Sequence, residues 1–159
     1  MSGFEIKMGQ AEDIPELHQL IVELARFEKA EQEVTTTPEI LLRDWQERGA
    51  FDFSLARSHD GKLAGMALFY PRYSTWKGHC LYLEDLYVCE AFRGQGLGRT
   101  FLSFLKNYAL ERGLRRIDWQ VLDWNLPAIN FYENLGAAIE KEWFNCKWYL
   151  PSGDENNAG

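Results

Sequence analysis

The sequence predicts an α/β (or α+β) fold: one domain in which a mixed, mostly antiparallel sheet is flanked by helices. Segments of alternating apolar residues are interspersed with segments whose apolar residues recur every three or four positions, in the order β-α-α-β-β-β-α-β-α-β. A chain of 159 residues, 46% of them hydrophobic, fits one domain with a sizeable core. We therefore expect a single domain over residues 1–150 and a disordered polar tail over residues 151–159.

The first third of the chain contains one expected strand and two expected helices. Residues 3–8 alternate in hydropathy as an opening strand does. Asp13 stands three residues before Glu16, which is the spacing of a capping box at a helix start. Thr37 and Pro38 fit the N-cap and first position of a second helix. Apolar residues recur on one face behind both starts, so we expect two amphipathic helices.

The remaining elements alternate between strands and helices. The Asp60-Gly61 pair indicates a hairpin between two strands. A long helix ends near Gly113, and Gly136 closes a short helix as the residue after its C-cap. The expected strands are residues 53–57, 63–70, 81–88, 117–121 and 138–150, and the expected helices are residues 97–113 and 127–135.

Composition and charge argue against several classes of protein. The chain has 17 Lys and Arg against 24 Asp and Glu, a net charge of −7 that repels phosphate backbones and disfavours a nucleic-acid partner. Cys80, Cys89 and Cys146 lack the spacing of a zinc site or a disulfide framework, so we expect no metal. Apolar runs are too short for a membrane span and no secretory signal is visible, so we expect a cytoplasmic protein without a membrane partner.

The segment RGQGLG, which begins at Arg93, lies between an expected strand and an expected helix. Glycines let backbone N–H groups approach a ligand closely, and the helix N-terminus adds partial positive charge, so this turn suits a phosphate. Arg93 and Arg99 add full charges. A nucleotide-binding P-loop is excluded because no Gly-Lys-Ser/Thr ending follows, and a dinucleotide-binding turn is excluded because Arg99 stands where the third glycine belongs. A plain glycine-rich turn remains the alternative.

Beyond this turn, the sequence resembles the GNAT superfamily of N-acetyltransferases over almost its whole ordered length. RGQGLG matches the superfamily's pyrophosphate loop, R/Q-x-x-G-x-G/A, and the expected element order is also that of the superfamily. The blocks ELARFEKAEQEV, YSTWKG, LYLEDLYV, LDWN and PAINFY resemble the diamine acetyltransferase group. YSTWKG together with VLDWN is closer to the thialysine-acetylating branch than to the spermidine/spermine branch.

This resemblance implies acetyl-CoA as the acetyl donor and a set of residues that bind it. The strand backbone at residues 86–88 would hold the pantetheine arm, the turn at residues 94–99 would hold the pyrophosphate, and residues 125–128 would line the other side. The implied cofactor-binding residues are Leu86, Tyr87, Val88, Arg93, Gly94, Gln95, Gly96, Leu97, Gly98, Arg99, Asn125, Leu126, Pro127, Ala128 and Tyr132.

The resemblance also implies a small amine as the substrate, held by acidic and aromatic side chains. The implied substrate-binding residues are Phe27, Glu28, Glu84, Asp85, Asp118, Trp119, Gln120 and Glu142. Ser74 stands where spermidine-type members carry Asp, which weakens a spermine interpretation. The same resemblance implies a homodimer.

Amine acetylation requires a group that removes a proton and a group that supplies one. An alkyl ammonium of pKa ~10.4 costs about 4.6 kcal/mol to deprotonate at pH 7. Glu84 fits the superfamily position for accepting that proton directly or through water, and Tyr132 fits the position of the general acid that protonates the leaving thiolate. Asp85 is expected on the opposite face of the strand from Glu84. The alternatives are an ordinary ion pair for Glu84 and core packing for Tyr132.

We therefore expect an acetyl-CoA-dependent N-acetyltransferase that acts on a thialysine-like or lysine-like amino acid or a diamine. The amine is expected to attack the thioester directly in a ternary complex, because no cysteine lies in a motif typical of an activated nucleophile. Acetylation of a polyamine or of a protein amine is a second interpretation. A catalytically inactive acetyl-CoA-binding sensor is a third.

Overall fold

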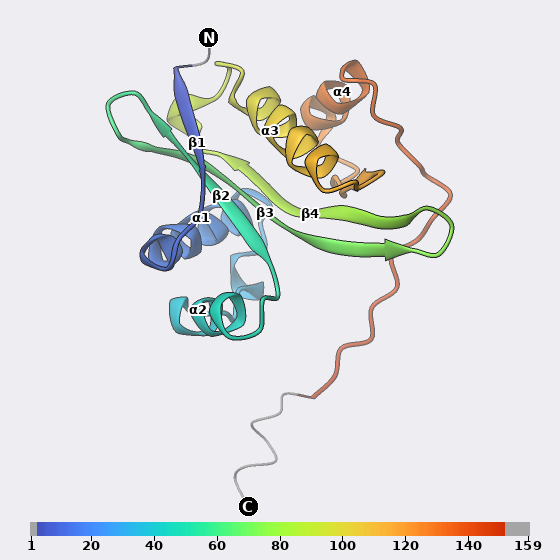
Figure 1. The fold of residues 1–159 in the computed structure, drawn as a ribbon, viewed down its shortest axis with the longest axis horizontal. Helices are drawn as coiled ribbons and strands as arrows, with labels where there is room; N and C mark the ends of the chain where they lie inside the picture. The colour runs from blue at the N-terminus through green and yellow to red at the C-terminus, as the bar shows by residue number, and fades with distance from the viewer. Residues whose placement is uncertain (1–2, 152–159) are drawn as a thin grey trace, which may run out of the picture. The chain divides into compact units, whose positions relative to one another are not determined.

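A five-stranded sheet in the order β1-β2-β3-β4-β5 organises the larger of two units into which the contacts divide the chain (Figure 1). The computed structural model describes residues 3–151, and the units are Met1–Gln120 and Val121–Gly159. The first four strands pair antiparallel and β5 pairs parallel to β4, which confirms the expected α/β class and mixed sheet. The strands are β1 (Phe4–Met8), β2 (Asp52–Ser58), β3 (Leu63–Ser74), β4 (Gly78–Val88) and β5 (Ile117–Asp118).

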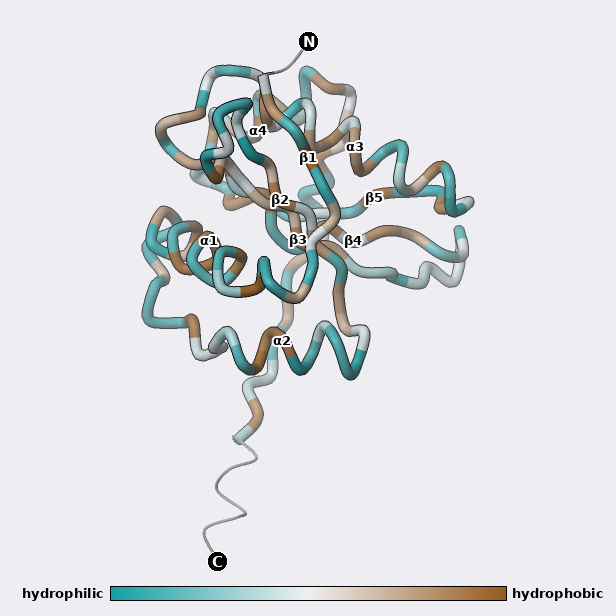
Figure 2. The backbone as a smooth tube through the Cα atoms, turned by 60° about the vertical axis from the view of Figure 1, so that its left-hand side comes forward, coloured by the Kyte–Doolittle hydropathy of each residue, from teal (hydrophilic) through white to brown (hydrophobic). Residues whose placement is uncertain are grey.

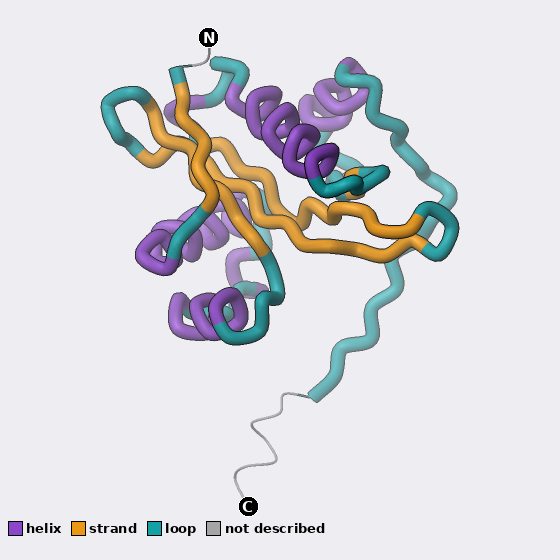
Figure 3. Tube along the Cα trace, in the orientation of Figure 1, coloured by secondary structure: helices purple, strands orange, loops and turns teal. Residues whose placement is uncertain are grey.

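Helices cover both faces of this sheet. α1 (Ile14–Phe27) and α2 (Pro38–Gln46) lie on one face and α3 (Leu97–Glu111) lies on the other (Figures 1 and 3). In Figure 2, α1 carries brown apolar residues interspersed with teal polar ones, as expected of a helix with one buried face. No helix among residues 3–151 is long and apolar enough to cross a bilayer.

Two hydrophobic cores form where the helices meet the sheet. The α3-side core consists of Ala56, Ala64, Ala67, Phe69, Leu81, Leu83, Leu97, Phe101, Leu105 and Ala109. The α1-side core consists of Ile14, Leu17, Leu20, Leu41, Phe53, Leu55, Met66, Leu68 and Tyr87. Because β3 and β4 contribute to both cores, their side chains are fixed in direction along most of their length.

Both helices begin where expected, with Asp13 at the N-cap of α1 and Thr37 at the N-cap of α2, but only Thr37 caps its helix through its side chain. Thr37 caps α2, since its hydroxyl accepts a hydrogen bond from the backbone N–H of Ile40 at 3.2 Å. The expected pairing of Asp13 with Glu16 is wrong. A short 3₁₀ turn precedes α1, so the Asp13 carboxylate accepts from the N–H of Gln10 at 2.9 Å, and Glu16 instead forms an ion pair with Arg57 of β2 at 2.7 Å.

The smaller unit contains α4 (Leu126–Asn134) within its described residues. The side chain of Asn125 caps this helix by accepting from the N–H of Ala128 at 3.4 Å. Gly136 follows with a φ of 88°, as expected of the glycine that ends a helix.

The expected closing strand at residues 138–150 is wrong. This segment has no ladder partner among the described residues, and its large apolar side chains are exposed. An alternating pattern becomes a strand only when another strand pairs with it. Pro151 is exposed and without regular structure, and the rest of the expected disordered tail, residues 152–159, lies outside the described residues.

Candidate active site

The glycine-rich turn connects β4, through a short 3₁₀ turn, to the start of α3. Gly94 and Gly96 have φ values of 76° and 82°, a left-handed conformation that favours glycine. No heavy atom lies within 4 Å of where a Cβ would stand at either position, so the backbone conformation, not the space, requires glycine. Gly96 is the N-cap of α3, and the first N–H groups of a helix have no intrahelical acceptor. With Leu97 buried at the helix start, these N–H groups form a cradle suited to a phosphate.

Arg93 fastens this turn to the end of β4 and to α1. Its Nε donates to the carbonyl oxygen of Val88 at 3.0 Å. Its guanidinium stacks over the rings of Phe27 at 5.0 Å and Tyr87 at 5.6 Å. Phe27, an expected substrate contact, therefore lies against the turn.

Beyond its centre, β4 pairs with another strand on one side only. Residues 86–88 pair with residues 65–67 of β3. On the opposite side, the described pairing with β5 covers Leu81 and Tyr82 and extends no further. An extended ligand can bind along such an edge through strand-type hydrogen bonds.

A β-bulge in β4 turns two neighbouring carboxylates to the same face of the sheet. Leu83 and Asp85 pair with consecutive residues of β3, so Glu84 is the extra residue. Asp85 pairs with Leu68 of the α1-side core, and Glu84 accepts a hydrogen bond from Tyr70, which packs against the same core. The expectation that Asp85 faces away from Glu84 is therefore wrong, because side-chain alternation is interrupted at a bulge.

Asp85 at this bulge is influenced by two other carboxyl groups. Burial, with the charges of Glu84 and Glu28, raises the pKa of Asp85 from 3.8 to about 7. Burial also raises the pKa of Glu28, which caps the C-terminal end of α1. Since Asp85 and Glu28 are both harder to ionise than in water, the cluster is electrostatically suited to a bound cation.

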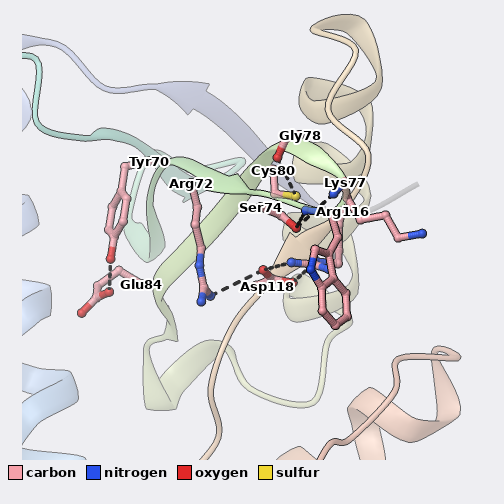
Figure 4. Close-up of polar contacts among 10 residues, drawn as sticks. Tyr70, Arg72, Ser74, Lys77, Gly78, Cys80, Glu84, Arg116 and Asp118 are labelled. Carbon is pink, nitrogen blue, oxygen red and sulfur yellow. Dashed lines mark hydrogen bonds and ion pairs between the residues drawn. The ribbon is translucent and has the colours of Figure 1, made fainter. Parts of the chain in front are cut away.

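Glu84 lines a small open pocket on the sheet face that carries α1. Its Oε2 accepts from the Tyr70 hydroxyl at 2.8 Å, and Figure 4 shows the two side chains pointing toward each other. The Tyr70 and Tyr82 rings lie 5.4 Å apart. Burial and the Glu84 carboxylate raise the pKa of Tyr70, so its hydroxyl keeps its proton and donates. The pocket has a volume of about 310 Å³ and is lined by Tyr70, Arg72, Tyr82, Glu84 and Gln120.

Asp118, an expected contact for a cationic substrate, is paired with two guanidinium groups. Arg116 contacts both of its oxygens, with Nε 2.7 Å from Oδ1 and Nη2 3.2 Å from Oδ2. Arg72 contacts Oδ2 from the pocket side at 3.5 Å (Figure 4). Of the two residues that follow, Trp119 packs partly against the α3-side core, whereas Gln120 lines the pocket.

Sequence reasoning missed three residues of this pocket. Tyr70, Arg72 and Tyr82 were not among the expected site residues. Alternation along β3 places Tyr70 and Arg72 on one face, and this pattern was the available signal. It was not sufficient, because the sequence does not reveal that β4 places Tyr82 and Glu84 beside them.

The smaller unit carries the expected acid. Tyr132 lies on α4 with its ring 5.5 Å from that of Phe131, and burial raises the pKa of its hydroxyl. Asn125 caps the same helix, and Glu142 lies in the exposed segment that follows. Within residues 3–151, no group of three or more potential ligands is arranged to hold a metal ion.

Comparisons with known proteins agree with this fold. Residues 15–137 match the model of a family described as the acetyltransferase (GNAT) family. The chain is 39% identical over 150 residues to a thialysine N-epsilon-acetyltransferase of Caenorhabditis elegans, with 92% of each chain covered. It is 36% identical over 153 residues to a spermidine/spermine N(1)-acetyltransferase-like protein of Homo sapiens, covering 90% of this chain and 22% of that protein. A crystal structure of an aminoglycoside acetyltransferase from a soil metagenome, in complex with trehalose, superimposes with a TM-score of 0.78 at 19% identity, covering 94% of this chain and 97% of that one.

Proposed function

The chain belongs to the acetyltransferase (GNAT) family and is an N-acetyltransferase, and on that premise we propose that it transfers an acetyl group from acetyl-CoA to a primary amine of a small, thialysine-like or lysine-like substrate. The observation that carries this proposal is the carboxylate cluster at the β4 bulge, beside a pocket of about 310 Å³. An ammonium group fits this cluster by charge. The pocket volume suits a small molecule.

Acetyl-CoA, the acetyl donor of this family, supplies an activated thioester when it is bound. The glycine turn fits its pyrophosphate, because Gly94 and Gly96 hold the open conformation and α3 adds its N-terminal N–H groups. The one-sided β4 edge at residues 86–88 fits an extended amide-bearing arm. From the family resemblance, we assign Asn125 and its neighbours to the other side of the same molecule.

Proton removal is assigned to Glu84, acting directly or through water, since it lines the pocket. Moving a proton from an ammonium of pKa ~10.4 to a carboxylate of pKa ~3.9 costs about 9 kcal/mol, whereas a carboxylate of pKa ~7 lowers that cost to about 5 kcal/mol. Asp85, whose pKa is about 7, therefore suits a role as the second proton site beside Glu84. Direct attack by the amine then needs no covalent enzyme intermediate.

Protonation of the leaving sulfur is assigned to Tyr132. Burial raises the pKa of this hydroxyl, so it keeps its proton at neutral pH. Burial in the same site also raises the pKa of the leaving thiol, which offsets the rise at Tyr132. Tyr132 is therefore expected to contribute to turnover and to have no large role in acetyl-CoA binding.

Thiol release from acetyl-CoA, measured with lysine, thialysine, diamines and polyamines, tests this function. We expect Tyr132→Phe to lower kcat at least tenfold with little change in acetyl-CoA affinity, and Glu84→Gln to move the acidic limb of the pH–rate profile. Turnover and pH profiles identical to the wild type would remove these residues from the mechanism. Tight acetyl-CoA binding without turnover of any amine would favour a sensor instead.

Polyamine acetylation is the second candidate, because of the similarity to the spermidine/spermine acetyltransferase-like protein. The same amine panel distinguishes the two candidates, because polyamine acetylation predicts a higher kcat/KM for spermidine than for lysine or thialysine. We further propose a cytoplasmic homodimer. Light scattering tests the dimer, and cell fractionation tests the cytoplasmic location.

A further inference from the structure

We propose that Arg72 binds a carboxylate of the amine substrate, so that the pocket selects amino acids over diamines. This inference rests on the proposed function, because it assumes that the amine lies at Glu84. It adds an anion-binding position to the same pocket.

Arg72 is positioned by β3 to face the pocket. It follows Tyr70 by two residues, so both side chains are on the same face of the strand and both line the pocket. Its guanidinium carbon lies 5.3 Å from the centre of the Tyr82 ring, which limits how far the side chain can swing. About half of the Arg72 side chain, 54%, remains exposed, so the group can still meet a ligand.

The charge of Arg72 is only partly neutralised by the protein. Asp118 is engaged on both oxygens by Arg116, at 2.7 and 3.2 Å, the paired geometry that an arginine and a carboxylate prefer. Arg72 adds one long contact of 3.5 Å to an oxygen that Arg116 already contacts. Two guanidinium groups therefore share this carboxylate, and Arg72 makes the longer of the two contacts with it.

The pocket consequently has charges of both signs in its lining. Glu84 presents a carboxylate and Arg72 a guanidinium. Arg72 follows Tyr70, the hydrogen-bond partner of Glu84, by two residues on β3, a spacing of about 7 Å along the strand. A lysine-sized ligand can therefore reach both groups, with its amine at Glu84 and its carboxylate at Arg72.

A diamine meets the same pocket less well. It has no anionic group for Arg72, and its second ammonium would lie near a guanidinium of the same sign. The Gln120 amide, also in the lining, can donate to a carboxylate but adds no charge that would favour a cation. The arrangement therefore separates lysine from cadaverine, two molecules that differ by the carboxylate alone.

The test compares lysine, lysinamide and cadaverine as acetyl acceptors for the wild type and Arg72→Gln. We expect Arg72→Gln to raise KM for lysine about tenfold with little change in kcat, and to leave KM for lysinamide and cadaverine unchanged or lowered. Arg72→Lys keeps the charge and should restore part of the lysine affinity. Arg48→Gln, which removes an exposed arginine paired with Asp44, is the matched control.

A second variant tests the effect of Asp118, the carboxylate that Arg72 and Arg116 share. Arg116→Gln leaves Asp118 to Arg72 alone, so KM for lysine should rise while KM for cadaverine does not. Equal changes for lysine and cadaverine in both variants, with acetyl-CoA affinity and far-UV circular dichroism preserved, would overturn the role of Arg72 while leaving the proposed function intact. A wild type that acetylates none of the amines would overturn both proposals.

Discussion

Asp85 is a carboxyl group that folding makes harder to ionise. Its pKa rises from 3.8 to about 7 because it is buried and close to Glu84 and Glu28. Between these two pH values the folded chain keeps a proton that the unfolded chain has released, so stability falls as pH rises from about 4 to about 7 and is then constant. The loss amounts to as much as about 4 kcal/mol, since each pKa unit corresponds to about 1.4 kcal/mol.

Asp85→Asn should therefore be more stable than the wild type above pH 7, and this advantage should shrink toward pH 4. Urea unfolding followed by circular dichroism at pH 5 and pH 8 measures both values. Glu47→Gln, at an exposed position after α2, is the control and should change neither. An Asp85→Asn variant with wild-type stability at pH 8 would mean that this carboxyl is not strained by burial.

The turn before α3 is an element in which conformation, not packing, dictates the residue type. Alanine at Gly96 meets no atom within 4 Å but must adopt a φ of 82°, at a cost of roughly 1–2 kcal/mol. We expect Gly96→Ala to weaken acetyl-CoA binding in calorimetry by about tenfold, since a relaxed backbone no longer presents its N–H groups to one point. Gly49→Ala is a matched control, because Gly49 also has a positive φ and open space but follows α2. If both variants lost the same affinity for acetyl-CoA, the turn at Gly96 would have no specific role in binding it.

Strand β4 illustrates how far local sequence patterns reach. The segment LYLEDLYV predicts the strand correctly, and Glu84 and Asp85 lie within it. The direction of Asp85 could not be predicted, because the bulge arises from the pairing of β4 with β3, which is not encoded in either segment alone. The same limit hid Tyr70 and Arg72, whose importance depends on which residues of β4 lie opposite them.

Considered as a whole, the chain was most predictable where an element has its own local signal. The helix cap at Thr37 and the glycine after α4 are local signals, and the structure has both at or near helix ends. The segment 138–150 alternates in the same way as a strand but remains unpaired among the described residues, because pairing needs a second strand that its own sequence does not specify.

The distribution of buried residues predicts how the chain responds to truncation. Every buried member of the α1-side and α3-side cores lies between Ile14 and Ala109, within the larger unit. A chain that ends at Gln120 keeps both cores and all five strands, so we expect cooperative thermal unfolding with little loss of strand signal in circular dichroism. The same truncated chain lacks Tyr132, so its turnover should fall at least as far as that of Tyr132→Phe. This loss is expected even if calorimetry shows that the truncated chain still binds acetyl-CoA. Broad, non-cooperative unfolding of the truncated chain would instead mean that residues after Gln120 complete the fold of the larger unit.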